Sequence, residues 1–367
     1  MRVVLIAGAR PNFVKIAPVR RALAERQGIE VMVIHTGQHY DDEMSAGFFR
    51  DLEIADPERN LGVGSGSHAA QTAGVMVAFD AFLDEVEVDM VVVVGDVNST
   101  VACSLTAVKR GIPVAHVEAG LRSFDWEMPE EINRLVTDRL SSLLFTPSRD
   151  GDENLLKEGR PAEAIHLVGN VMVDTLLRFR DKAAQSDVLK RLALSEGGYA
   201  VLTLHRPRNV DSRDAFAGML DALDTISGRI RVVYPMHPRS RKTLTEAGLM
   251  ERAEAMAGLT MTGPLGYLDF LELEARAAFA MTDSGGVQEE TTVLGVPCLT
   301  LRPNTERPVT ITNGTNKLVG TEPVAIVEAA MRVLDGVDET AGGVPELWDG
   351  HAAERIADIV ESYGRGS

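Results

Sequence analysis

The segment MVVVVGDVNSTVACSLTAVK, residues 90–109, indicates the fold class of the chain. Its five consecutive apolar residues, Met90–Val94, predict a strand buried on both faces, as in a parallel sheet covered by helices. A polar turn follows, and Thr100–Lys109 is typical of a helix. Strand, turn and helix in this order form half of a right-handed crossover, and therefore predict a doubly wound α/β fold.

The same rhythm extends outward from this segment and restarts in the second half of the chain. The first half contains predicted strands at Val3–Ile6, Val31–Thr36, Met90–Val94, Val114–Val117, Leu143–Thr146 and Ile165–Val168, and helices at Asn12–Arg26, Thr100–Lys109 and Glu130–Ser141. The second contains strands at Ala200–Leu204, Val232–Met236, Leu259–Met261, Phe279–Thr282 and Cys298–Leu301, and helices at Asp214–Ile226, Leu268–Ala275 and Val287–Leu294.

We therefore expect an α/β protein with two Rossmann-like doubly wound domains, residues 1–169 and 170–351. A last helix within about residues 352–367 is expected to pack back on the first domain. The carboxyl ends of both sheets are expected to line a cleft between the domains.

Composition excludes several classes of function. The 367 residues carry a formal net charge of −17, which argues against binding to nucleic acid or to anionic membrane. The apolar run Val3–Ala7 is too short for a secretory signal and no segment has the length of a membrane span, so we expect a cytoplasmic protein. Cys103 and Cys298 lie in apolar segments and are expected to be buried thiols rather than metal ligands.

Two strand ends have the small or basic residues that favour a diphosphate. Gly8 ends the first strand, and Arg10 and Lys15 follow at the start of a helix, where free amides attract anions. The alternative is a plain turn with a surface arginine. The glycine spacing is not that of a dinucleotide-binding fingerprint.

The strongest local pattern is Thr282-Asp-Ser-Gly-Gly-Val-Gln-Glu-Glu290. Here a strand ends, Ser284, Gly285 and Gly286 make the turn, and a helix begins. Small residues let phosphates approach the backbone amides, and Glu290 lies one and a half turns further along, where it is expected to hold ribose hydroxyls.

Carboxylates follow two strands of the first domain and open one helix. Asp96 follows Met90–Val94, and Glu118 follows Val114–Val117, at the sheet edge where α/β sites are built. Asp96 has the alternative of capping a helix, a role that Asn98 or Ser99 could fill, and Glu118 that of pairing with Arg122.

Glu130 and Glu131 open a helix, about 100° apart, so at most one of them points into the cleft. In the second domain, His205 and His237 each follow a strand, which makes both candidates for the site, although single histidines are more often structural.

Together these segments resemble the non-hydrolysing UDP-N-acetylglucosamine 2-epimerase family. The resemblance covers nearly the whole chain, in order, through Gly8–Lys15, Thr36–His39, Gly95–Thr100, His116–Arg122, Pro129–Arg134, His205–Arg206, Asp283–Glu290 and Glu306–Pro308. It implies two Rossmann-like domains in the glycosyltransferase-B arrangement, a UDP-sugar substrate, no NAD or metal cofactor, and a homodimer.

The resemblance also implies residue roles. The catalytic group would comprise Asp96, Glu118, Glu130 and His205, and the substrate-binding group Arg10, Lys15, Arg134, His237, Ser284, Gly285, Gly286, Glu290 and Arg307. The reaction would be anti-elimination of UDP to a 2-acetamidoglucal, followed by re-addition with the C2 proton on the opposite face.

Some segments depart from the family pattern. The chain has His205-Arg-Pro-Arg-Asn209 where the family often has His-Arg-Arg-Glu-Asn, and Leu121–Pro129 is closer to a branch that acts on diacetamido-uronate UDP-sugars. A UDP-diacetamido-uronate 2-epimerase, a UDP-sugar transferase of the same architecture, a hydrolysing epimerase and a non-catalytic nucleotide-sugar sensor remain the alternatives.

Many bacterial relatives are activated by a second substrate molecule, and the sequence predicts that this chain is not. Gln38 and His39 match the effector pocket, but Tyr40–Glu43 places acids where a diphosphate would approach. The expected arginine falls near Ala73-Gly74, where the chain has no positive charge.

Overall fold

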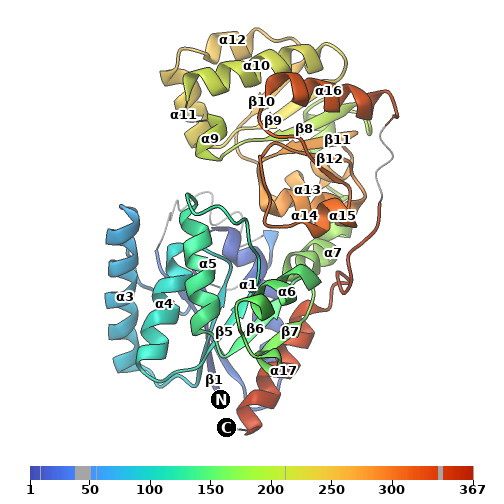
Figure 1. Cartoon of the computed structure of the whole chain (residues 1–367). Helices are drawn as coiled ribbons and strands as arrows, with labels where there is room; N and C mark the ends of the chain where they lie inside the picture. Colours follow the sequence, from blue (N-terminus) through green and yellow to red (C-terminus); the bar gives the residue numbers. More distant parts are fainter. Residues whose placement is uncertain (9, 38–50, 55, 211, 338–341, 367) are drawn as a thin grey trace. The chain divides into compact units, whose positions relative to one another are not determined.

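The computed structural model describes residues 1–8, 10–37, 51–54, 56–210, 212–337 and 342–366 (Figure 1). The chain divides into two compact units. Unit 1 comprises Met1–Arg178 and Glu346–Ser367, and unit 2 comprises Phe179–Pro345. The division therefore lies C-terminal to the boundary expected at Gly169–Asn170, inside helix α7 (Val171–Ala183).

Unit 1 is built on a seven-stranded sheet in the order β3-β2-β1-β4-β5-β6-β7. Its strands are β1 (Arg2–Ala7), β2 (Glu30–His35), β3 (Arg59–Asn60), β4 (Met90–Val94), β5 (Val114–Val117), β6 (Leu143–Thr146) and β7 (Ile165–Leu167). Every neighbouring pair is parallel. Because the strand order reverses between β1 and β4, their carboxyl ends flank the point where ligands bind in such folds.

Helices cover both faces of this sheet. They are α1 (Arg10–Ala24), α3 (His68–Glu85), α4 (Asn98–Lys109), α5 (Pro129–Leu140), α6 (Arg149–Lys157), the first part of α7, and α17 (Ala352–Gly366), with a 3₁₀ turn at Ala162–Ala164. In Figure 1, α3, α4 and α5 lie side by side on one face, while α1 and α17 pack together on the other. The parallel sheet is therefore shielded from water on both sides, as its apolar strands require.

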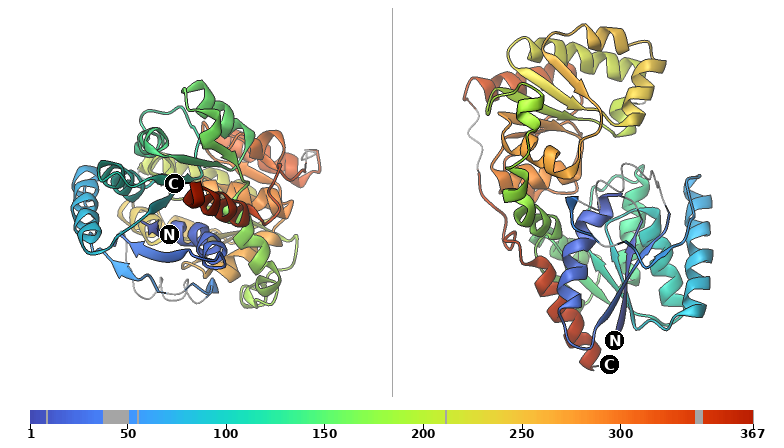
Figure 2. Two further views of the ribbon diagram at one scale, coloured as in Figure 1. Left: turned by 90° about the horizontal axis from the view of Figure 1, so that it is seen from below. Right: turned by 180° about the vertical axis from the view of Figure 1, so that it is seen from behind.

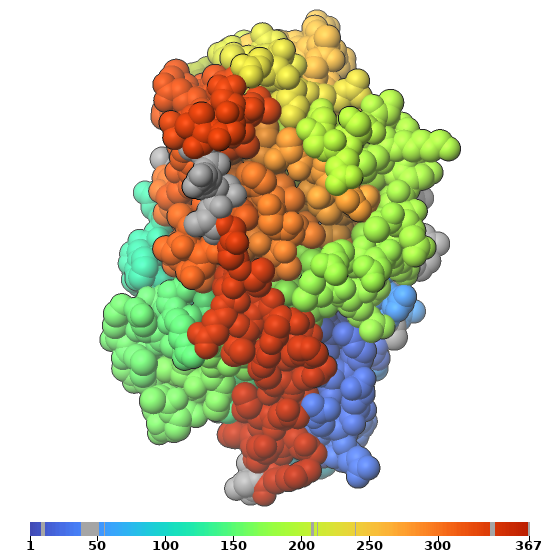
Figure 3. All heavy atoms as spheres, turned by 90° about the vertical axis from the view of Figure 1, so that its right-hand side faces the viewer, coloured from blue at the N-terminus to red at the C-terminus, as the bar shows by residue number. Residues whose placement is uncertain are grey.

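The C-terminal helix α17 belongs to unit 1. Figures 2 and 3 show it against the N-terminal part of the chain, with the two termini close together. Arg26 binds Asp358 of α17 at 2.7 Å, and Asp174 accepts the backbone N–H groups of Ala352 and Ala353 at the start of the helix. Burial raises the pKa of Asp174 to about 6.

Unit 2 has a six-stranded parallel sheet in the order β10-β9-β8-β11-β12-β13. The strands are β8 (Tyr199–Thr203), β9 (Arg231–Pro235), β10 (Leu259–Thr262), β11 (Phe279–Thr282), β12 (Cys298–Thr300) and β13 (Asn316–Leu318). The helices are α8 (Val188–Arg191), α9 (Pro207–Val210), α10 (Arg213–Ser227), α11 (Pro238–Glu246), α12 (Met250–Glu254), α13 (Tyr267–Ala275), α14 (Gly285–Leu294), α15 (Val309–Thr312) and α16 (Pro323–Leu334). The strand order again reverses, between β8 and β11, so this unit has its own switch point.

The two doubly wound parallel sheets confirm the fold class expected from the sequence. The strands predicted at Met90–Val94, Val114–Val117, Leu143–Thr146 and Phe279–Thr282 match β4, β5, β6 and β11 end for end. Both cysteines are buried free thiols, as expected. Within the described ranges, no helix is long and apolar enough to cross a membrane.

Candidate functional site

Glu118 stands at the centre of the candidate site in unit 1. It follows β5, and its side chain is buried against Lys15 of α1, with 2.5 Å between Oε2 of Glu118 and Nζ of Lys15. The other oxygen, Oε1, is buried and has no hydrogen-bond partner among the described residues. The backbone of Glu118 has φ 69°, a left-handed conformation that non-glycine residues adopt at a cost. A strained, buried carboxylate with one unused oxygen is typical of a functional residue.

Arg122 does not pair with Glu118, so the alternative structural partnership considered for these residues is wrong. Arg122 binds Glu158 and Asp138 instead, each at 2.7 Å. His116 also binds Asp138 at 2.6 Å. Burial alone would raise the pKa of Asp138, but the charges of His116 and Arg122 outweigh it and lower the pKa. The cation beside Glu118 is Lys15, which had been expected near a phosphate.

Asp96 follows β4, the strand next to β5, and Val94 and Val117 are paired across the two strands. Its carboxylate accepts from Arg134 of α5 and is about one third exposed. Helix α4 begins at Asn98 with Val97 as its N-cap, so Asp96 does not cap it and neither do the side chains of Asn98 or Ser99. Asp96 and Glu118 thus lie at adjacent strand ends of one sheet.

Glu130 and Glu131 have different environments at the start of α5. Glu131 is buried and accepts from the backbone of Ser123 and Phe124 and from Arg134, at 3.0, 2.9 and 2.6 Å. Burial would raise the pKa of Glu131, but these donors lower it below its usual value. Glu130 is partly exposed, and its side chain forms no hydrogen bond or ion pair with the described residues. Glu131 therefore orders the loop before α5, whereas Glu130 keeps its carboxylate available.

Arg134 is 2% exposed and lies between two acids, Asp96 and Glu131. This position allows it to orient Asp96, and it is held too deeply to turn freely toward solvent. Asn133, which the sequence did not single out, donates to the backbone oxygen of Asp96 at 2.9 Å and to Asn98 at 3.2 Å. The only sequence signal for Asn133 was its place beside Arg134 on the same helix.

In unit 2, the Ser284–Gly286 turn opens α14 directly after β11, as the sequence predicted. The guanidinium of Arg307 lies over Gly285, such that a Cβ there would be 2.4 Å from Nη1. Arg307 binds Glu289 at 2.6 Å and Glu306 at 2.8 Å. A cation beside a helix N-terminus faces the positive end of the helix dipole, so an anion at this turn would be stabilised by both.

A second ion-pair group supports this turn. Glu306 is buried and binds Arg302 at 2.6 Å as well as Arg307. Burial would raise the pKa of Glu306, but Arg307, Arg302 and Arg206 hold it well below its usual value. The carboxylate therefore stays ionised and fixes the guanidinium of Arg307.

His205 follows β8 and its ring is held by a buried carboxylate. Nδ1 of His205 binds Asp283 at 2.8 Å, and Asp283 also accepts from the backbone of Arg206 and from Asn209, both at 2.9 Å. Half of the His205 side chain remains exposed. His237 precedes α11 and is exposed.

Glu290 lies on α14, as expected, but it is only 6% exposed. Burial raises the pKa of Glu290 to about 8, and the charge of Glu289 adds to this effect. The carboxyl group of Glu290 is therefore nearly enclosed, in the second turn of α14.

Several expected positions lie outside the described part of the chain. The side chain of Arg10 and the segment Gln38–Glu43 are among them, so the expected phosphate contact and the expected absence of an effector site stay predictions. Ala73 and Gly74 are on α3.

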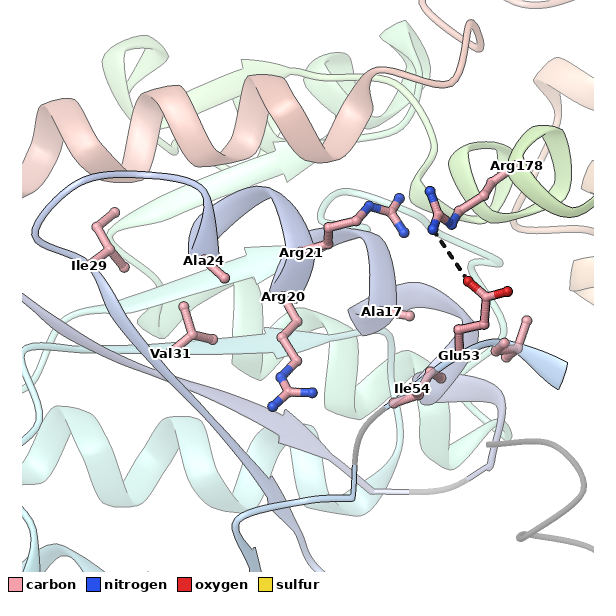
Figure 4. Close-up of a pocket in the computed structure, with 10 residues that line it drawn as sticks. Ala17, Arg20, Arg21, Ala24, Ile29, Val31, Glu53, Ile54 and Arg178 are labelled. Carbon is pink, nitrogen blue, oxygen red and sulfur yellow. Dashed lines mark hydrogen bonds and ion pairs between the residues drawn. The ribbon is translucent and has the colours of Figure 1, made fainter. Parts of the chain in front are cut away.

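A pocket of about 340 Å³ in unit 1 is lined by α1, β2 and the residues near Glu53 (Figure 4). Arg178 of α7 borders it and binds Glu53 at 3.4 Å. None of the residues expected at the functional site lines this pocket.

Comparison with known proteins finds a matching family and similar relatives. The family model described as UDP-N-acetylglucosamine 2-epimerase matches residues 21–361. The chain is 40% identical to the UDP-N-acetylglucosamine 2-epimerase of Methanocaldococcus jannaschii over 100% of both chains. It is 38% identical to the UDP-2,3-diacetamido-2,3-dideoxy-D-glucuronate 2-epimerase of Pseudomonas aeruginosa over 98% of this chain and 99% of that one.

Solved structures of UDP-GlcNAc 2-epimerases also match almost the whole chain. The M. jannaschii enzyme in complex with UDP-GlcNAc and UDP matches with a TM-score of 0.92 and 39% identity, over 99% of this chain and 100% of that one. The Neisseria meningitidis enzyme bound to UDP-GlcNAc matches with a TM-score of 0.90 and 29% identity, over 99% and 100%. These likenesses confirm the fold class expected from the sequence, two Rossmann-like domains of the glycosyltransferase-B type.

We predict that Gly285→Ala destabilises the chain because the new methyl group would collide with a guanidinium that two carboxylates hold in place. The free energy of unfolding measured in urea should fall by about 1–3 kcal/mol, the usual cost of overpacking. Gly263→Ala is the control, since a Cβ there meets no atom within 4 Å and the change should cost less than about 0.5 kcal/mol. Equal losses for the two variants would contradict the packing described at Gly285.

Proposed function

The chain belongs to the UDP-N-acetylglucosamine 2-epimerase family, and we propose that it inverts C2 of UDP-N-acetylglucosamine to give UDP-N-acetylmannosamine. The observation that carries the proposal is the group of carboxylates at the carboxyl edge of unit 1. Glu118 is buried on Lys15 with Oε1 unused, Asp96 is oriented by Arg134, and the side chain of Glu130 binds no described residue. Such a group can take a proton from one face of a sugar and return one to the other.

The chemistry explains why separate carboxylates are needed. The C2 proton of an N-acetylhexosamine has no adjacent carbonyl group, so direct removal of this proton is very costly. Departure of UDP from C1 develops positive charge beside C2 and makes its proton more acidic. The proposed route is anti-elimination of UDP to a 2-acetamidoglucal, followed by re-addition of UDP and protonation of C2 on the opposite face. Inversion therefore requires an acid and a base on different faces of the ring.

Unit 2 supplies what the leaving group requires. The free amides of the Ser284–Gly286 turn and the guanidinium of Arg307 are proposed to bind the diphosphate and to stabilise its charge as the C1–O bond breaks. Glu306 and Glu289 hold Arg307, so little reorganisation is needed when the charge develops. Glu290 is proposed to accept the ribose hydroxyls. His205, held by Asp283, is proposed to contact the sugar-phosphate part of the substrate.

Two different substrates are named for relatives of similar identity to this chain. The P. aeruginosa relative carries the name of a diacetamido-uronate epimerase at 38% identity, against 40% for the M. jannaschii epimerase. We favour UDP-N-acetylglucosamine because that is the name of the family model. Parallel assays with both UDP-sugars decide between them.

We predict that the purified chain converts UDP-N-acetylglucosamine alone, without added NAD or metal, to a mixture with its C2 epimer. In deuterated water, proton NMR should show the loss of the C2 proton signal in the epimer as deuterium is incorporated. An epimer that keeps its original C2 hydrogen would rule out elimination. No epimer at all, with release of the sugar onto an added acceptor, would identify a transferase.

We predict that Asp96→Asn, Glu118→Gln and Glu130→Gln each lower kcat by about 10²–10⁴, the usual effect of removing an acid or base. Calorimetric affinity for UDP should change little, because none of these three carboxylates is among the groups proposed to bind the diphosphate. Glu131→Gln is the matched control beside Glu130: it should lower the melting temperature, since Glu131 accepts five hydrogen bonds from its own loop and helix. A folded Glu131→Gln variant with a far larger loss of kcat than Glu130→Gln would reverse this assignment.

We further propose that the enzyme is a homodimer that associates through α5. This helix has an inverted pattern, with Glu131, Arg134 and Asp138 buried and with apolar residues at the surface. Ile132 and Val136 are 45% and 37% exposed, and Trp126 beside them is 70% exposed. With Leu135, Arg139 and Leu140, these three residues line an apolar groove of about 270 Å³. A helix that buries its polar residues and exposes its apolar ones is typical of an oligomer interface.

The dimer is tested by sedimentation velocity. The wild-type chain should sediment as a dimer at micromolar concentration, and Val136→Glu should shift it to a monomer, because a charge buried in an apolar interface is costly. Val324→Glu, at a valine that is 71% exposed in unit 2, is the control and should remain a dimer. A monomeric wild-type chain, or a Val136→Glu variant that remains dimeric, would contradict this interface.

A further inference from the structure

The pocket of about 340 Å³ in unit 1 gathers positive charge that the proposed reaction does not use (Figure 4). Its charged lining residues are Arg20 and Arg21 on α1, Arg178 on α7, and Glu53. The whole chain has 37 lysines and arginines against 54 acids, so an excess of arginine is the opposite of what its composition favours. A concave surface lined mainly by charges of one sign attracts ions of the other sign, which here are anions.

Arg21 and Arg178 point toward each other at this pocket (Figure 4). The side chain of Arg21 binds no carboxylate within the described ranges. Burial and the charge of Arg178 lower the pKa of Arg21. Three acids act in the opposite direction: Glu25, Asp174 and Glu53. Two guanidinium groups in this arrangement repel each other, and an anion that contacts both of them removes the repulsion.

The three acids are poorly placed to neutralise Arg21. Asp174 is buried and accepts the backbone N–H groups at the start of α17. Glu25 is exposed and forms no ion pair in the described part of the chain. Glu53 binds Arg178 at 3.4 Å, but the two side chains are 54% and 43% exposed, and an exposed pair of this length stabilises little. An external anion can therefore replace Glu53 at Arg178 and bind Arg21 at the same time.

The remaining lining residues define the shape of a ligand. Arg20 is already paired, with Glu58 at 2.7 Å, so its charge is largely neutralised. The other lining residues are apolar: Ala17, Ala24, Ile29, Val31, Leu52 and Ile54. The volume of the pocket lies at the lower end of the range of about 300–1,000 Å³ found for small-molecule sites. A phosphate at the arginines and a small apolar group against these side chains match both parts of the lining.

We propose that this pocket is a ligand site separate from the proposed UDP-sugar site, and that it binds a phosphate monoester with a small apolar group. The phosphate oxygens accept hydrogen bonds from Arg21 and Arg178, because a planar guanidinium donates to phosphate through two N–H groups at once. Glu53 competes with the ligand for Arg178. The site is independent of the proposed reaction, since no residue assigned to the UDP-sugar lines it.

Carbon-13-detected NMR of the full-length chain, labelled in arginine, tests the site directly, because each guanidinium carbon reports its own contacts. The probes are inorganic phosphate and phenyl phosphate at constant ionic strength. The Cζ signals of Arg21 and Arg178, assigned by their loss in Arg21→Gln and Arg178→Gln, should shift saturably with both probes. Phenyl phosphate should bind more tightly, because its ring leaves water for the apolar wall. Arg180 does not line the pocket, so its signal is the internal control and should not shift.

Variants test the sign of each contribution to binding. Glu53→Gln should strengthen phosphate binding about two- to fivefold, since it removes the competing carboxylate. Arg178→Gln, followed at the Arg21 signal, should weaken binding about tenfold or more, the usual effect of losing a hydrogen bond to a charged group. Arg21→Gln should keep the wild-type melting temperature, because the Arg21 side chain binds no carboxylate among the described residues.

Arg21 and Arg178 signals that do not shift, or that shift no more than the Arg180 signal, would overturn the proposal. Weaker phosphate binding in Glu53→Gln would also overturn it, and phenyl phosphate that binds no more tightly than inorganic phosphate would contradict the apolar part of the ligand. The epimerase assay is a separate test. An inactive chain whose Arg21 signal shifts saturably would contradict the proposed function alone, and an active epimerase without such shifts would contradict this site alone.

Discussion

The ion pair between Lys15 and Glu118 joins the first helix of unit 1 to the end of strand β5, next to the central strand β4. Both side chains are nearly excluded from water, where an isolated charge would cost more than a protein of this size can tolerate. The position of each therefore depends on the other, and the left-handed backbone of Glu118 is the local cost of bringing its carboxylate to Lys15. Other buried charges near the edge of the sheet are paired in the same way. Arg134 forms ion pairs with Asp96 and Glu131, and Asp138 forms ion pairs with His116 and Arg122. One consequence is that α1, α5 and the ends of β4 and β5 form a fixed group of acids with matched donors.

Unit 2 meets the same requirement in two ways. Around the Ser284–Gly286 turn, arginines pair with the buried acids. They hold the pKa of Glu306 well below its usual value, and Glu306 and Glu289 hold Arg307 over Gly285. Glu290 on α14 is nearly enclosed instead, and burial raises the pKa of its carboxyl group to about 8. These solutions suit different ligands, because a fixed guanidinium and free amides attract a diphosphate, whereas an enclosed carboxylate accepts hydroxyl groups. In the proposed reaction the two units are thus complementary: unit 2 is proposed to bind the nucleoside diphosphate, and unit 1 to provide acids and bases.

The sequence predicted the architecture well because buried parallel strands are continuous apolar runs. Met90–Val94 and Phe279–Thr282 match β4 and β11 exactly, whereas the short edge strands β3 and β13, which carry polar residues, were not predicted. The sequence also predicted which strand ends hold polar groups, since that follows from topology. It did not predict the pairing, because a side chain's partner depends on three-dimensional packing: Lys15 rather than Arg122 faces Glu118. The burial of Glu272 and Glu274 was missed for a related reason, since Leu-Glu-Leu-Glu in a helix is expected to place its glutamates in water, and here α13 buries both of them.

The central claim is that the carboxylates of unit 1 act on C2 only while the bond from C1 to UDP is broken. The most direct test is positional isotope exchange with UDP-N-acetylglucosamine that carries ¹⁸O in the bridge between C1 and the β-phosphorus. The account predicts that, as the epimer forms, ¹⁸O moves from the bridge to the non-bridging positions of the β-phosphate, in the recovered substrate and in the product. An epimer that forms at full rate with all of the ¹⁸O still in the bridge would contradict it.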